Sequence, residues 1–263
     1  MPTNSVEMDA LQFIQLRGSS TVLKVMQRIG SAYMDTYSDI RLPLVGGGTA
    51  MGYKSVLDGT SDIGMAAGQM PASIEVWATR NHLSIQNVTI AIDGISPIVN
   101  LANPTNDLTL DQLHDIFTGK ITNWNALGKF SGPINVISHD PQLGTYETWK
   151  REVAGKDYIT LKAKVVNHLA ELNSAIMSDP HAISYVGNTF LDKAKVKPLT
   201  VNGLAPSIQN IQLEKYPIRS KLQLLITSSP SKEVSNFVAY CLDPSQGQAI
   251  IKEMGLVPVA KLS

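Results

Sequence analysis

The chain has 263 residues, which is enough for one large domain or two lobes. Because 43% of the residues are hydrophobic and 17% are charged, the chain can bury a full-sized core, and global disorder is excluded. Its 22 basic and 22 acidic residues cancel, which excludes the basic footprint of a nucleic-acid-binding or anionic-membrane-binding protein. Cys241 is the only cysteine, so no intramolecular disulfide can form.

Strand-like and helix-like patterns alternate along the first hundred residues, which predicts α/β layers with mostly parallel sheets. Apolar residues at helical spacing over residues 22–33 predict the first helix. A second helix is expected over residues 50–57, and a third begins at Pro71. The expected strands cover residues 11–16, 40–45, 62–67, 88–92 and 95–101, with Asp93-Gly94 interrupting the last two.

The alternation of strand-like and helix-like segments resumes after Asp93-Gly94. Thr109 and Gln112 have the spacing of a capping box, which predicts a helix up to residue 117 with Gly119 as its stop. Strands are expected over residues 134–138, 183–186, 196–201 and 222–227, and helices over residues 146–153, 168–177, 234–242 and 246–254.

Three short segments of glycine and hydroxyl residues carry the main functional signal. They are Gly-Ser-Ser-Thr at residues 18–21, Gly-Gly-Gly-Thr at 46–49, and Gly144-Thr145. Each precedes a helical pattern, and there backbone N–H groups and hydroxyls can converge on an anion. Glycine lets the backbone approach a ligand closely, and Ser or Thr adds an uncharged donor. Together the segments predict a pocket for a small oxyanion.

Simpler interpretations of these residues remain open at this point. The hydroxyls of residues 19–21 can serve only as a helix cap, Asp93 can be an ordinary turn residue, and His139 can lie in a surface loop. No Lys-Ser or Lys-Thr follows the triple glycine, which excludes a Walker loop, and the glycine spacing does not fit a dinucleotide fingerprint. No nucleophile elbow or carboxylate pair indicates catalysis, and the histidines show no metal-binding spacing.

Short segments spread over nearly the whole chain resemble the periplasmic phosphate-binding proteins of bacterial ABC importers, in their short form. The most specific segment is Phe-Thr-Gly-Lys-Ile-Thr-Asn-Trp at residues 117–124, whereas the glycine segments alone carry little specificity. The other matching segments are residues 18–21, 46–49, 59–65, 92–95, 108–110, 216–219 and 246–249.

The resemblance implies a two-lobe α/β fold in which each lobe is a mostly parallel sheet flanked by helices, joined by a hinge. The breaks at Asp93-Gly94 and Asn202-Gly203 then predict a discontinuous first lobe, residues 1–93 and 203–263, and a second lobe, residues 94–202. The implied ligand is inorganic phosphate or a similar oxyanion, and the implied partner is a membrane ABC permease. The resemblance also implies a monomer outside the cytoplasm, periplasmic or extracellular, with its signal peptide removed; no cofactor, metal or nucleic acid is implied.

Seven ligand-binding residues follow from the resemblance, position by position. Asp93 stands where the family places a carboxylate that accepts a hydrogen bond from protonated phosphate and repels fully ionised anions such as sulfate. The implied donors are Ser20, Thr21, Thr49, Gly144 and Thr145, with His139 at the position of a family arginine.

The chain departs from the family pattern just before Gly144. His139 replaces the usual arginine, and Leu143 replaces a serine that would donate a hydrogen bond. Each lost charge-assisted bond costs roughly 1.5–3 kcal/mol of binding free energy. If His139 serves in the pocket, we expect its pKa to rise from about 6.5 when an anion binds. A second interpretation is therefore a divergent module of the same fold for sensing or protein interaction, with weak or no phosphate binding.

Overall fold

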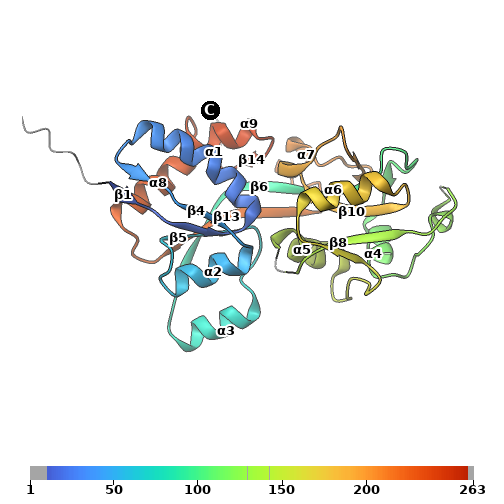
Figure 1. The fold of residues 1–263 in the computed structure, drawn as a ribbon, viewed down its shortest axis with the longest axis horizontal. Helices are drawn as coiled ribbons and strands as arrows, with labels where there is room; N and C mark the ends of the chain where they lie inside the picture. The colour runs from blue at the N-terminus through green and yellow to red at the C-terminus, as the bar shows by residue number, and fades with distance from the viewer. Residues whose placement is uncertain (1–10, 129, 142, 260–263) are drawn as a thin grey trace, which may run out of the picture.

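The longest strand, β6 (Ile85–Val99), runs between two lobes and belongs to both of them (Figure 1). It pairs antiparallel with β13 (Arg219–Thr227) up to Gly94, and with β10 (Ala182–Gly187) from Ile95 onward. The computed structural model describes residues 11–128, 130–141 and 143–259.

The predicted interruption at Asp93-Gly94 is wrong, because β6 continues through both residues. The carboxyl group of Asp93 is buried and accepts a hydrogen bond from Thr189, which makes a polar side chain tolerable inside the strand. Gly94 leaves room for a neighbouring segment, since a Cβ atom there would lie 2.6 Å from Cδ1 of Ile211.

In the first lobe the strand order is β4-β2-β5-β13-β6, with β2 parallel to both β4 and β5. Figure 1 shows α1 and α9 on one side of this part of the sheet and α2 and α3 on the other. The apolar face of α1 packs in a core that includes Val22, Met26, Ile29 and Phe237, which confirms the helix predicted over residues 22–33. The strands are β1 (Gln12–Phe13), β2 (Leu16–Gly18), β3 (Ile40–Arg41), β4 (Leu44–Gly46), β5 (Ile63–Ala66) and β14 (Val257–Pro258). The helices are α1 (Ser20–Thr36), α2 (Thr49–Leu57), α3 (Ala72–Arg80), α8 (Lys232–Leu242) and α9 (Gly247–Glu253).

In the second lobe the order continues from β6 through β10, β8 and β9, with the last three strands parallel. The capping box is confirmed, because Thr109 Oγ1 accepts from the Gln112 N–H and Gln112 Oε1 accepts from the Thr109 N–H. The strands are β7 (Asp107–Leu108), β8 (Asn135–His139), β9 (Lys164–Val166), β11 (Lys197–Pro198) and β12 (Thr200–Val201). The helices are α4 (Leu110–Phe117), α5 (Gly144–Trp149), α6 (Leu169–Ser178) and α7 (Ile208–Gln212), with short helical turns η1 (Trp124–Leu127), η2 (Lys150–Ala154) and η3 (Asn188–Phe190).

The single strand predicted over residues 196–201 is wrong, because two short strands replace it. β11 pairs with β6, whereas β12 pairs with β7. The N–H of Leu199 still donates to the Pro97 carbonyl oxygen of β6 at 2.9 Å, and the chain changes partner at Thr200, whose N–H donates to the Asn106 carbonyl oxygen at 3.0 Å.

The second core lies around Trp124, Trp149 and Tyr185, and it also takes in Ile211 and Tyr216 from the segment that follows β12. Asn202 and Gly203 form a turn with φ angles of 53° and 74°, and they lie before that segment. The division into residues 1–93 with 203–263 and residues 94–202 stays a prediction.

Candidate functional site

Close backbone packing places the starts of α1 and α2 side by side. Gly18, the last residue of β2, has φ +135°, and a Cβ atom there would lie 2.2 Å from the Met65 carbonyl oxygen and 2.7 Å from Cα of Gly52. Only glycine fits this conformation and this contact. The strand ends of β2 and β5 and the first turn of α2 therefore meet at one point.

The triple-glycine segment lies beside a cavity of about 170 Å³ between the lobes, which Gly48 lines. The N–H groups of Gly47 and Gly48 donate to the Gly18 carbonyl oxygen at 2.8 and 3.2 Å. These two donors are therefore used inside the protein, and the use of Thr49 as a donor stays a prediction. The segment ties the start of α2 to the start of α1.

Five of the seven predicted site residues line one cavity of about 170 Å³ between the lobes. They are Ser20, Thr21, His139, Gly144 and Thr145. They come from the start of α1, the end of β8 and the start of α5. The helix starts thus meet at the cavity from both sides, as the sequence predicted.

The hydroxyls at the start of α1 divide their roles. Ser19 is the N-cap, and its side-chain oxygen accepts from the Val22 N–H at 3.5 Å. Ser20 and Thr21 follow in the first turn, where the N–H groups of a helix have no intrahelical acceptor. The cap interpretation therefore applies to Ser19, and it leaves Ser20 and Thr21 available to a ligand.

Thr49 lies behind the cavity wall. Its Oγ1 accepts from the Ala67 N–H at 3.1 Å, and the hydroxyl keeps its own proton to donate. A Cβ atom on Gly144 would lie 2.7 Å from Thr49 Oγ1. Gly144 therefore lets the start of α5 in one lobe approach the start of α2 in the other.

His139 lies in the site rather than in a surface loop. The residue is 7% exposed, its Nδ1 is 2.8 Å from Thr145 Oγ1, and its ring stacks on Tyr185 with centroids 4.5 Å apart. Its Nε2 is buried and has no hydrogen-bond partner among the described residues. Burial lowers the pKa of His139 from the ordinary 6.5 to about 4 in this structure, and the rise in its pKa expected on anion binding stays a prediction. The imidazole is neutral at pH 7 and can offer an Nε2–H donor when Nδ1 accepts from Thr145.

Asp93 also lies just behind the wall. Its Oδ2 accepts from Thr189 Oγ1 at 3.0 Å, while its Oδ1 is buried without a hydrogen-bond partner in the described part of the chain. Burial raises the pKa of Asp93 to about 7, against the lowering effect of hydrogen bonds from Thr189. The ordinary-turn interpretation is thereby excluded, because the residue is 2% exposed inside a strand.

Sequence reasoning missed the segment Gly187-Asn188-Thr189. Gly187 lines the cavity, and a Cβ atom there would lie 2.5 Å from Asp93 Oδ2, so any side chain would collide with the carboxyl group. The segment has the same signal as the others, a glycine and a hydroxyl residue directly after a strand. This local pattern could have identified the segment from the sequence.

One part of the cavity wall is hydrocarbon. Val166, Leu172 and Val186 are buried members of a core cluster beneath α6, and they line the cavity together with Leu143 and Phe190. No lysine or arginine is among the described residues that line it. The site therefore combines helix starts, hydroxyls and a neutral imidazole with an apolar wall.

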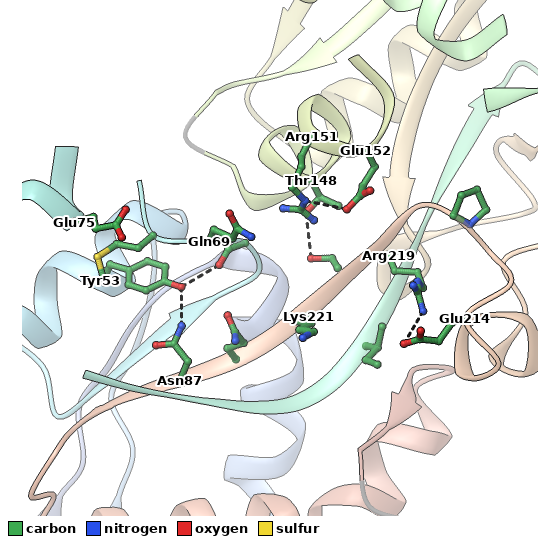
Figure 2. Close-up of a pocket in the computed structure, with 16 residues that line it drawn as sticks. Tyr53, Gln69, Glu75, Asn87, Thr148, Arg151, Glu152, Glu214, Arg219 and Lys221 are labelled. Atoms are coloured by element: carbon green, nitrogen blue, oxygen red, sulfur yellow. Dashed lines mark hydrogen bonds and ion pairs between the residues drawn. The ribbon is translucent and has the colours of Figure 1, made fainter. Parts of the chain in front are cut away.

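A larger groove of about 590 Å³ lies along β13 (Figure 2). Its charged side chains are largely paired: Arg151 with Glu152 at 2.9 Å and Arg219 with Glu214 at 3.2 Å. Its described lining includes no residue from the first turn of α1, α2 or α5. The smaller cavity is therefore the better candidate for an anion site.

Features of two other protein classes are absent from the described ranges 11–128, 130–141 and 143–259. Within them, no group of three His, Cys, Asp or Glu side chains is placed to hold a metal ion. The described helices also include none with the length and apolar character needed to cross a membrane.

Comparison with known proteins gives consistent relatives. The phosphate-binding protein PstS of Bacillus subtilis is 24% identical over 256 residues, which cover 95% of this chain and 81% of that protein. A solved structure from Clostridium perfringens is described as a phosphate ABC transporter substrate-binding protein with bound phosphate. It superposes on this chain with a TM-score of 0.86 at 27% sequence identity, and the superposition covers 95% of this chain and 100% of that one. An ABC-type phosphate transport receptor of Vibrio cholerae gives 0.79 at 25% identity, covering 93% and 99%.

The two-lobe α/β fold agrees with these relatives. A family model described as the PBP superfamily domain matches residues 5–245. Because the match spans most of the chain, the chain belongs to the PBP superfamily.

Proposed function

We propose that this chain is a solute-binding protein that captures phosphate or a related tetrahedral oxyanion for an ABC importer. The observation that carries the proposal is the meeting of helix starts from both lobes at one cavity, beside the buried Nε2 of His139. Helix starts attract anions because unpaired N–H groups and the positive end of the helix dipole point the same way. The names of the relatives, phosphate-binding and phosphate-transport proteins, support the same ligand class.

In this proposal the lobes close on the ligand about a hinge formed by β6 and β13. Ser20 and Thr21 would hold the anion from the first lobe, and Gly144 and Thr145 from the second, with Thr49 completing the hydroxyl set. Asp93 would accept a hydrogen bond from a protonated oxyanion. Closure of two lobes about a ligand is a common way for such a fold to remove the ligand from water.

The lobe boundaries form part of the same proposal. Packing of Ile211 and Tyr216 in the second core favours a return crossing at Arg219, where β13 begins to pair with β6 at Gly94, over one at residue 203. Hydrogen exchange with and without ligand would test this, because protection should change on both sides of the cavity and at these two strand positions.

We also infer a place outside the cytoplasm, a monomeric state, and a membrane ABC permease as the partner that receives the ligand. The relatives that support this are transport proteins, and no catalytic step is proposed. Chemical cross-linking to the permease in whole cells would test the partner.

Calorimetric titration with phosphate tests the proposed ligand. We expect saturable binding by the native chain and binding weakened at least tenfold by Thr145→Val, which removes the hydroxyl that donates to Nδ1 of His139 and so keeps the Nε2–H donor on the ligand side. Thr79→Val is the matched control, because Thr79 is exposed on α3 and its hydroxyl bonds only within that helix. No binding of phosphate, arsenate or sulfate would instead favour a sensing or protein-interaction module.

A further inference from the structure

The wall of the cavity is not built for an ion with four equivalent oxygen atoms. Its polar groups lie at the starts of α1 and α5, at His139, and at Asn167 and His168 between β9 and α6. Val166 lies beside His139, since β8 and β9 pair these two residues in register. A ligand held by the helix starts and His139 therefore also meets hydrocarbon in the cavity.

That hydrocarbon is fixed in place by the core. Val166 and Val186 are each 2% exposed and Leu172 is fully buried, and all three belong to the cluster beneath α6. Leu143 extends the apolar wall at the start of α5, where it is the N-cap but contributes no side-chain hydrogen bond. An oxygen atom of phosphate held against these side chains would lose its water and gain no donor, which is unfavourable.

The volume of the cavity also favours a ligand larger than a single tetrahedral oxyanion. Its volume of about 170 Å³ exceeds many times over the roughly 10–15 Å³ that admits one water molecule. Val186 and Phe190 line part of this space.

We propose that the ligand is an oxyanion with a phosphoryl head and a short apolar tail, of which a short-chain alkylphosphonate is the simplest. Three oxygen atoms on the head meet the N–H groups of the helix starts, that of Thr145 included, and the Nε2–H of His139, and the tail covers Val166, Val186 and Leu143. This inference rests on the proposed function, because it requires that the cavity binds a tetrahedral oxyanion.

The test is calorimetric titration of the full chain with phosphate, methylphosphonate, ethylphosphonate and methyl phosphate at one pH. We expect ethylphosphonate to bind about fourfold tighter than methylphosphonate, the effect of one buried methylene, and tighter than phosphate. Equal affinities for ethylphosphonate and methyl phosphate support a site that recognises any phosphoryl head with a short apolar tail. A preference between them shows whether the natural ligand is a phosphonate or a phosphate ester. Phosphate binding tighter than both phosphonates would overturn the inference and leave the proposed function standing, whereas no binding of any of these anions would overturn both.

A paired variant locates the tail. Leu143→Ser exchanges hydrocarbon for a hydroxyl donor at the cavity wall, so the ratio of ethylphosphonate to phosphate affinity should fall at least tenfold. Leu161→Ser is the matched control, because Leu161 is fully exposed in the same lobe, and its ratio should equal that of the native chain. An unchanged ratio in Leu143→Ser would contradict the placement of the tail.

Discussion

The hydroxyl of Thr189 donates to Asp93 Oδ2 at 3.0 Å, and this bond joins the start of η3 to the strand that links the lobes. The carboxyl group is buried behind Gly187 at the cavity wall, and its pKa is raised to about 7. The imidazole of His139 lines the same cavity with its pKa lowered to about 4. Burial thus moves the pKa of the acid and the pKa of the base in opposite directions, in each case toward the neutral form.

The raised pKa of Asp93 predicts a loss of stability with increasing pH. Because the folded-state pKa of about 7 exceeds the ordinary value of 3.8, the contribution is complete below about pH 4 and is lost as the pH rises through 7. Asp93→Asn should remove this loss and increase the free energy of unfolding at pH 8 by up to roughly 4 kcal/mol. Urea unfolding at pH 4.5, 6 and 8 measures it, and parallel profiles of the two proteins would contradict it.

The lowered pKa of His139 should have the opposite effect on how the free energy of unfolding changes with pH. Its folded-state pKa of about 4 lies below the ordinary 6.5, so its contribution is complete above about pH 6.5 and is lost as the pH falls through 4. Between pH 4 and 6.5 the two groups oppose each other, so we expect the native chain to show little net slope. His139→Gln should then reveal the Asp93 decline, and the Asp93→Asn, His139→Gln double variant should be nearly flat in the same unfolding experiment. A native chain with a steep slope in this window would count against the assignment.

Binding of sulfate should depend on the ionisation of Asp93. Sulfate has no proton to share, so it is repelled once the carboxyl group ionises, and its affinity should fall at least tenfold between pH 5.5 and 8. Phosphate can share its proton with the carboxylate and should lose less affinity. Asp93→Asn should flatten the sulfate profile when titrated by calorimetry.

Two histidine variants serve as controls for that profile. His139 is already neutral in this pH range because its pKa is lowered to about 4, so His139→Ala should weaken sulfate at all pH values without changing the slope. His168, whose exposed side chain also lines the cavity, is replaced by Gln as the second control. A slope that disappears in either histidine variant would assign the pH dependence to that residue instead.

Lys24 on α1 contacts the η3 segment of the other lobe and should hold the lobes together. Its Nζ donates to the Thr189 carbonyl oxygen at 2.6 Å and lies 4.5 Å from the ring centroid of Phe190. Lys24→Met should speed ligand dissociation about fivefold to tenfold, because a charged hydrogen bond between the lobes is lost. Stopped-flow release of phosphate measures this rate, with Lys252→Met on the exposed surface of α9 as the control. Equal release rates in the two variants would show that Lys24 does not hold the lobes.

The sequence predicted the helices and the helix-start cluster well, because these depend on local signals. The glycine and hydroxyl segments before α1, α2 and α5, and the capping box at Thr109, are each readable within a few residues. The features that the sequence did not predict depend on contacts between residues far apart in the sequence. β6 continues through Asp93 and Gly94 because Ser220 and Arg219 of β13 pair with them. The pKa of His139 is lowered because burial, with Tyr185 stacked against its ring, removes water.

The central claim is that a tetrahedral oxyanion binds where the helix starts of both lobes meet. Its most direct test is a crystal structure of the chain with arsenate, located by the anomalous signal of arsenic. The account predicts one arsenic site in the 170 Å³ cavity, with oxygen atoms within hydrogen-bond distance of Thr21, Thr145 and His139 Nε2. Arsenic bound only elsewhere, for example in the groove beside Arg219 and Lys221, would contradict it.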